Sequence, residues 1–190
     1  GSFKNALVPV IADRAHLKSM YNQVHAEFYN ATLGRLQGNV SLYNYNYFFN
    51  SILITQDGQQ IPSRLNGEEI AIGAEYDKII GGFELEGAVK YNLSGDLGGN
   101  LLNASAGYRL NERHRASVSA YASSRMPDFN FLLYQSDYQN YNWFNLDVFE
   151  KEQVYGLQFK LDSEIWGDLM VDYTTVDNYS YFGQDPDVPL

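Results

Sequence analysis

Period-two alternation of apolar and polar residues most constrains the fold of this 190-residue chain. In the segment VYGLQFKL, residues 154–161, Tyr, Leu, Phe and Leu alternate with Val, Gly, Gln and Lys. Successive side chains of a strand point to opposite faces, so such a run predicts a strand with one apolar and one polar face. Eight runs of this kind, each about ten residues long, occur between residues 21 and 176. No segment of useful length has a helical period, so the chain is predicted to be all-β.

The connections between the predicted strands alternate in character. Those at 30–34, 78–82, 111–113 and 163–167 are short, whereas those at 44–67, 94–99, 125–151 and from 178 onward are longer or more polar. Outer-membrane barrels have tight turns at one end and long loops at the other, and Greek-key sandwiches do not sort their loops so regularly. The sequence therefore predicts one antiparallel up-and-down transmembrane β-barrel domain over residues 1–190. It would have an irregular segment at 1–17 and long loops at 44–67 and 125–151. The first of these loops is expected to contain a local hairpin around Asp57-Gly58.

Composition and charge argue against several classes of function. The chain has no cysteine, and its three histidines are scattered, so no disulfide and no His/Cys metal site is predicted. A net charge of −10 without Lys/Arg clusters disfavours nucleic acid as a partner. No apolar run is long enough for a transmembrane helix. A mean hydropathy of −0.36 is compatible with a barrel, in which only alternate residues face lipid, and outer-membrane lipid is the expected partner.

The two faces of the predicted sheet differ sharply. Tyrosines lie toward several ends of the apolar face and fit an interfacial girdle, although the rim of a soluble barrel would also explain them. They are Tyr76, Tyr91, Tyr108, Tyr155 and Tyr173. Alternation alone does not tell which face points inward, and a lipocalin-like barrel would turn the apolar face inward. The long loops and small polar-face residues favour a wet lumen. The candidate lumen-lining residues are Glu69, Glu75, Glu84, Glu86, Lys90, Arg109 and Arg115.

The four glutamates of this polar face allow two interpretations. They can bias a pore toward cations or bind a hard divalent ion. The favoured alternative is a solvated face on which glutamates pair with Lys90, Arg109 and Arg115. No carboxylate pair suggests a general acid and base, and no nucleophile lies at a suitable spacing from a base. The chain is therefore not expected to be an enzyme, and no catalytic residue, metal ligand or cofactor is predicted.

The long loop at 125–151 is dense in Tyr, Asn and Asp. Its segment YQSDYQNYNWFN, residues 134–145, has the aromatic and amide groups that bind sugars, but a self-packed loop over the barrel mouth is the favoured interpretation. The residues expected at this mouth are Asp137, Tyr138, Tyr141, Asn142 and Trp143.

The same loop carries a family resemblance, together with the strands that follow it. The pairs and triplets Asp137-Tyr138, Tyr141-Asn142-Trp143, Asp177-Asn178-Tyr179 and Tyr181-Phe182 carry it. In these motifs the chain resembles the putative porin family of Bacteroidota outer membranes, mainly over residues 129–182. The resemblance implies an outer-membrane β-barrel and names no substrate. Members of that family are longer than this chain, which implies a segment of a larger barrel or one part of a bigger polypeptide.

Three functions are therefore carried forward from the sequence. The first is a porin-like passive diffusion channel for small solutes in the bacterial outer membrane. The second is a non-conducting barrel that uses its Tyr/Asn loops to contact other outer-membrane subunits. The third is a soluble β-barrel that binds a glycan or a small ligand.

Overall fold

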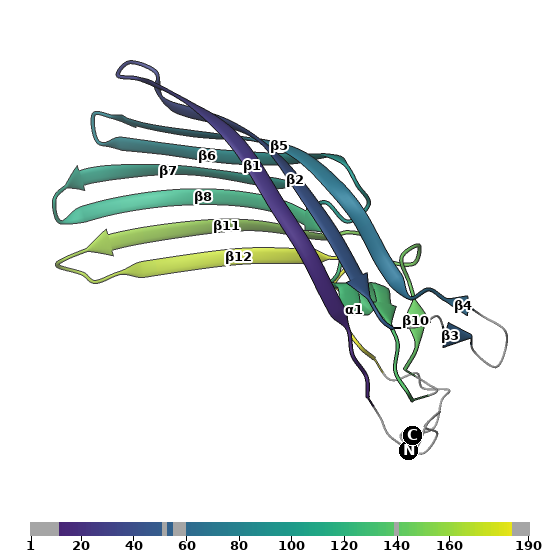
Figure 1. Cartoon of the computed structure of the whole chain (residues 1–190). Coiled ribbons are helices and arrows are strands. Elements are labelled where there is room, and N and C mark those ends of the chain that lie inside the picture. Colours follow the sequence, from purple (N-terminus) through teal and green to yellow (C-terminus); the bar gives the residue numbers. More distant parts are fainter. Residues whose placement is uncertain (1–11, 51–52, 55–59, 139–140, 184–190) are drawn as a thin grey trace.

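The computed structural model describes residues 12–50, 53–54, 60–138 and 141–183 (Figure 1). Within them, eight strands form one sheet in which each strand pairs antiparallel with the next along the chain. The predicted all-β up-and-down arrangement of eight strands is thus confirmed. The strands, in sheet order, are β1 (His16–Asn30), β2 (Gly34–Phe48), β5 (Arg64–Ile80), β6 (Phe83–Ser94), β7 (Leu101–Asn111), β8 (His114–Arg125), β11 (Glu152–Ser163) and β12 (Leu169–Asp177).

The sheet is open within the described residues. β1 and β12 form its two edges and each has one neighbour in the sheet order. Figure 1 shows a strong twist, with β1, β2 and the part of β5 nearer β4 (Gln60–Ile61) crossing the view at a steep angle to β6, β7, β8, β11 and β12. The closed barrel expected from the sequence is therefore not formed by these eight strands as they stand.

The connections separate by length, as the sequence predicts. At one end of the sheet they span residues 31–33, 81–82, 112–113 and 164–168. At the other end they span 49–63, 95–100 and 126–151. One of the two shortest turns is Gly81-Gly82, where both residues have positive φ (54° and 92°), a conformation that glycine adopts without steric cost. We call the second end of the sheet the mouth.

Three predicted boundaries were wrong. β2 extends to Phe48 and β5 starts at Arg64, so the expected loop at 44–67 is shorter at both ends. The ladder continues there without apolar alternation, because backbone pairing needs no apolar face and both faces carry polar or aromatic residues. β1 likewise starts at His16, inside the segment 1–17 expected to be irregular. Within 49–63, β3 (Leu53–Ile54) pairs with β4 (Gln60–Ile61), and the hairpin turn expected at Asp57-Gly58 lies outside the described residues.

The connection between β8 and β11, residues 126–151, folds over one face of the sheet, and we call it the cover. It contains the single-turn helix α1 (Phe129–Leu132) and the paired strands β9 (Leu133–Tyr134) and β10 (Trp143–Phe144). No helix in the described ranges is long and apolar enough to cross a membrane. Leu132 and Leu133 are fully buried against Tyr45, Tyr47 and other residues of the β2 and β5 ends. The core therefore lies at the mouth, because this segment crosses from β8 to β2.

The two faces of the sheet also differ in exposure. Along the first half of β2, Leu36, Gly38 and Val40 are exposed, whereas the polar residues between them are partly covered. The cover segment packs on the face that carries the polar residues, so we call this the inner face and the opposite one the outer face. The outer face exposes large apolar side chains on most strands: Val24 is 77% exposed, Leu102 54%, Leu157 57% and Val171 55%.

Replacing Gly156 with Ala is expected to destabilise the sheet by about 1–3 kcal/mol. The new Cβ would lie 2.0 Å from the ring of Tyr121, which spans β11 so that its hydroxyl can bond the Thr174 hydroxyl on β12 (2.6 Å). Gly38→Ala is the matched control, because its Cβ would meet nothing within 4 Å and alanine orders the strand at lower entropic cost. Urea unfolding of both variants checks this, and equal stabilities would contradict it.

Candidate functional site: the inner face and its mouth

All seven residues predicted to line the lumen lie on the inner face. The ladders place them in register: Glu86 lies opposite Asp77 and Ser105, and Arg109 lies opposite Arg115. Residues directly opposite on neighbouring strands point to the same face. Glu75, Glu84, Arg109 and Arg115 lie in the half of this face nearer the short turns, whereas Lys90, opposite Leu101, lies nearer the mouth and Glu69 lies at the mouth.

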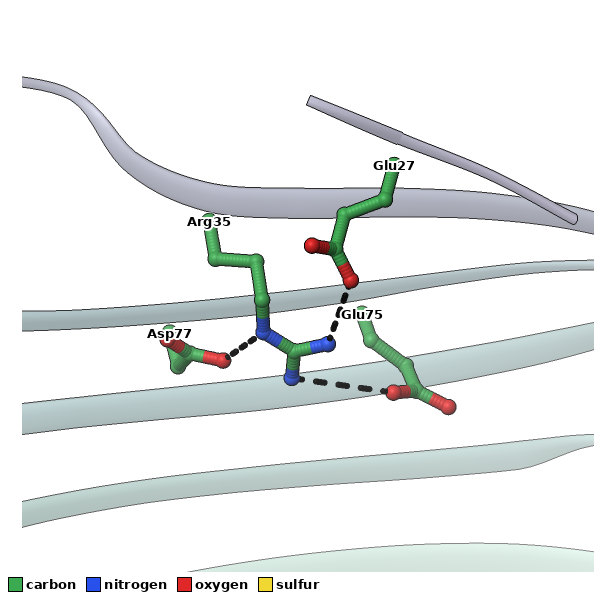
Figure 2. A network of polar contacts seen from close by, with 4 residues as sticks. All are labelled: Glu27, Arg35, Glu75 and Asp77. Atoms are coloured by element: carbon green, nitrogen blue, oxygen red, sulfur yellow. Dashed lines mark hydrogen bonds and ion pairs between the residues drawn. The ribbon is translucent and has the colours of Figure 1, made fainter. Parts of the chain in front are cut away.

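A charge network that the sequence analysis missed joins three strands (Figure 2). Arg35 on β2 reaches Asp77 on β5 through Nε at 2.5 Å and Glu27 on β1 through Nη1 at 3.4 Å. Its Nη2 lies 4.0 Å from Glu75. Three carboxylates share one guanidinium, so this part of the inner face keeps a negative balance. The side chains are one-third to one-half exposed, so these ion pairs contribute little to the stability of the fold. Their main effect is to place charge on the inner face.

Glu84 shows the arginine pairing that the sequence favoured. Its Oε1 accepts from Arg109 Nη2 at 2.6 Å, and its Oε2 lies 2.5 Å from Arg115 Nη2. The Glu84 side chain extends from β6, is only 11% exposed, and pairs with one cation on β7 and one on β8. The cluster carries a net positive charge and lies on the strands next to β1, β2 and β5, which carry the negative Arg35 network.

A groove of about 450 Å³ lies along β5 and β6 between these clusters. Asp77 and Glu86 face each other across the two strands at its wall, and Asn103 and Ser105 of β7 also line it. Like charges directly opposite destabilise a strand pair. Within the described ranges, neither Glu86 nor Lys90 has an ion-pair partner within 4 Å. The groove therefore presents unneutralised carboxylate to water, which attracts cations.

Glu69 differs from the other glutamates. It is only 6% exposed, since the connection at 95–100 folds over it. Its Oε1 accepts from the Leu97 N–H at 3.0 Å, and Leu97 packs against the core at the mouth. The loop approaches Glu69 this closely because Gly95 and Gly98 have no side chains. A Cβ on Gly95 would lie 2.3 Å from Glu69 Oε2, and a Cβ on Gly98 would lie 2.2 Å from it. This carboxylate holds a loop and does not line open space.

Aromatic stacking anchors the cover segment to the inner face. The Phe129 ring stacks on Tyr47 with centroids 5.3 Å apart and lies 5.4 Å from Tyr45. Gln135 Nε2 donates to the Pro62 carbonyl at 2.8 Å, which ties the cover to the connection between β2 and β5. The cover is therefore attached to strands on the far side of the sheet order from β8, and it packs over the inner face at the mouth.

The residues predicted at the mouth bind one another and the N-terminal side of β1. Asp137 Oδ2 accepts from the Ala12 N–H at 2.8 Å. Asn142 Oδ1 accepts from the Ser136 N–H, and its Nδ2 donates to the Tyr138 carbonyl at 2.7 Å. The Tyr138 and Tyr141 rings meet edge to face at 6.2 Å. These contacts match the expectation of a self-packed loop.

The Trp143 side chain also packs against neighbouring residues. Its ring stacks on Tyr134 at 5.0 Å, lies 5.7 Å from Phe182, and its Nε1 donates to the Asn130 carbonyl. Burial raises the pKa of the Tyr134 phenol, and the nearby Asp13 adds to this. With its ring packed in this way, Trp143 offers little free surface for stacking a sugar.

No cluster of three or more His, Asp or Glu side chains suited to a metal occurs in the part of the chain that the structure describes. The model of the family described as Putative porin matches residues 2–188. Comparisons with curated proteins and with solved structures find no match.

Proposed function

Since this chain belongs to the Putative porin family, we propose that it is an outer-membrane β-barrel protein through which small solutes diffuse passively. The family match covers nearly the whole chain, and the eight-stranded sheet with its sorted connections suits such a barrel. The observation that carries the proposal is the contrast between faces. Apolar side chains cover the outer face, and charged and amide side chains cover the inner one.

The exposed outer face favours a membrane over water. Soluble monomers rarely expose contiguous apolar surface of this extent. Rows of apolar residues run across the whole sheet, such as the one from Phe28 through Leu36 and Tyr76 to Leu157 and Tyr173. In the proposed orientation, the outward tyrosines predicted from the sequence supply the interfacial girdle. A soluble ligand-binding barrel would need this surface buried.

The two unpaired edge strands, β1 and β12, would need pairing partners in a membrane. Unpaired backbone groups are not tolerated in hydrocarbon, so β1 and β12 must both be paired there. An eight-stranded barrel fills its interior with side chains, whereas barrels with more strands enclose water. A conducting form therefore needs further strands between these edges, which agrees with the larger barrel that the resemblance implies.

The charge of the inner face predicts a modest preference for cations. The described strands place nine carboxylates and six Lys or Arg on this face, and charge on a pore wall biases selectivity. The carboxylates belong to Glu27, Glu69, Glu75, Asp77, Glu84, Glu86, Glu152, Asp162 and Asp172, and the cations to Arg35, Lys90, Arg109, Arg115, Arg125 and Lys160.

A second candidate function rests on the cover at the mouth. Because the cover packs across the inner face, a permanently blocked barrel would serve as a subunit of an outer-membrane assembly instead of a channel. Recording in planar bilayers separates the two. Discrete current steps with a reversal potential shifted toward the cation support the channel, and silent insertion of correctly folded protein supports the second candidate.

A further inference from the structure

We propose that the outer face at the mouth ends of β1, β2 and β5 binds the phosphorylated sugar headgroup of a glycolipid in the outer leaflet. The proposal rests on the proposed function, because it takes the mouth to be the extracellular end, where outer-membrane barrels carry their long loops. It starts from a change of character along these three strands. Their outer face is mainly apolar as far as the pair Leu42 and Ile70, and it is mainly polar in the three rows beyond that pair.

These rows hold two of the few cations on the outer face. The eight strands place three Lys or Arg side chains there: Lys18 and Arg64 at the mouth, and Lys78 near the short turns. Lys18 on β1 and Arg64 on β5 flank β2, so they lie about 10 Å apart across the sheet. In the described ranges, neither has an ion-pair partner within 4 Å. Two unneutralised cations at this height attract an anion.

The Phe48 ring supports Lys18 at this surface. Lys18 Nζ lies 5.8 Å from the ring centroid, and the His16 ring stacks on Phe48 with centroids 4.9 Å apart. An ammonium over an aromatic face is attracted to the ring and keeps N–H donors on the side away from it. Lys18 is therefore presented to a ligand with donors still available.

A hollow of about 590 Å³ lies between the two cations. Asn44, Asn46 and Asn66 line it together with Lys18 and Arg64. Amide groups donate and accept, which suits sugar hydroxyls, whereas ammonium and guanidinium groups suit phosphate oxygens.

The apolar part of the outer face adjoins this hollow. Leu42 and Ile70 follow directly below its polar rows, so the acyl chains of a lipid bound there would continue along apolar side chains. A phosphorylated glycolipid can use the cations, the amides and this apolar surface together. Inorganic phosphate would use the cations alone.

Binding of lipid A, a phosphorylated disaccharide glycolipid, to the purified protein tests the site by native mass spectrometry. Lys18→Gln and Arg64→Gln should each weaken binding about tenfold, the scale of one lost charge-assisted hydrogen bond. Lys78→Gln is the matched control and should keep the wild-type affinity, because Lys78 lies on the same face at the opposite end of the sheet. Glu68 also lines the hollow, so Glu68→Gln should strengthen binding severalfold by removing a charge that repels phosphate.

Two further probes identify the source of the bound chemistry. Lipid A without its phosphate groups should bind at least tenfold more weakly, and inorganic phosphate at the same concentration should not displace lipid A. Unchanged affinity in both Lys18→Gln and Arg64→Gln overturns the proposal. Equal binding of the dephosphorylated lipid overturns it too, as does displacement by inorganic phosphate.

Planar-bilayer recording separates this proposal from the proposed function. In phosphatidylcholine bilayers, Lys18→Gln and Arg64→Gln should keep the wild-type conductance, because neither residue lies on the inner face. A conducting protein that does not bind lipid A overturns this proposal alone. A silent barrel whose lipid A binding depends on Lys18 and Arg64 supports it and counts against the channel. Heat-modifiable gel mobility shows that each variant is folded.

Discussion

Replacing Leu132 with Asp is expected to detach the cover from the mouth and to raise single-channel conductance several-fold. Leu132 is fully buried in a cluster with Tyr45 and Tyr47 of β2 and Leu65 of β5. The change removes about 1.5–3 kcal/mol of apolar burial and places a carboxylate where no cation is close. Undocking the cover relieves both costs. The outer-face residues do not pack on the cover, so the sheet itself should persist.

Asn130→Asp is the matched control for this experiment. It introduces the same charge into the same helical turn, α1, but Asn130 is exposed, so conductance should remain at the wild-type level. Limited proteolysis checks the mechanism independently, because a detached cover should be cut between β8 and β11 before the strands are. Proteolysis that increases without any rise in conductance would show that the cover does not restrict the channel.

Replacing Val118 with Arg is expected to lower the free energy of unfolding from a bilayer by about 2–4 kcal/mol, the cost of a cation on the lipid face near the midplane. Val118 lies on the outer face in the middle of β8, between Ala106 and Phe159 of the neighbouring strands. Its side chain is 52% exposed on this face, so the Arg would have no protein partner.

Ser119→Arg provides the comparison one residue along the same strand. Ser119 points to the inner face between Ser105 and Gln158, where water and carboxylates can accommodate a guanidinium. Its stability should change by less than about 1 kcal/mol, the scale of an exposed charge substitution. Denaturant titration of both variants in lipid vesicles gives the two free energies. A larger loss for Ser119→Arg would reverse the assignment of the faces.

Local pattern and turn length carried the predictions that succeeded. A short turn fixes the register of the two strands it joins, so the hairpins around Gly81-Gly82 and residues 112–113 followed from the chain itself. Alternation then assigned each side chain to a face. This is why all seven proposed lumen residues share the inner face, and why Glu84 could be expected to meet Arg109 and Arg115.

Contacts between segments joined by the long connections could not be predicted from local pattern and turn length. The pairing of β2 with β5 spans residues 49–63, so nothing local sets the register that places Arg35 opposite Asp77. The burial of Glu69 depends on how the loop at 95–100 folds inward, and its only sequence signal was the glycine content of that loop. Leu132 and Leu133 offered an apolar pair inside a polar loop, but their partners on β2 and β5 depend on the curvature of the whole sheet.

Cysteine accessibility at Ala88 and Val89 tests the central claim most directly, because the chain contains no other cysteine. Ala88 lines the inner groove, and Val89 is the next residue of β6 and faces outward. In intact membranes, a water-soluble maleimide should label Ala88→Cys and leave Val89→Cys unlabelled until the membrane is dissolved and the protein unfolded. Labelling of Val89→Cys with protection of Ala88→Cys would contradict a water-lined polar face and a lipid-covered apolar one.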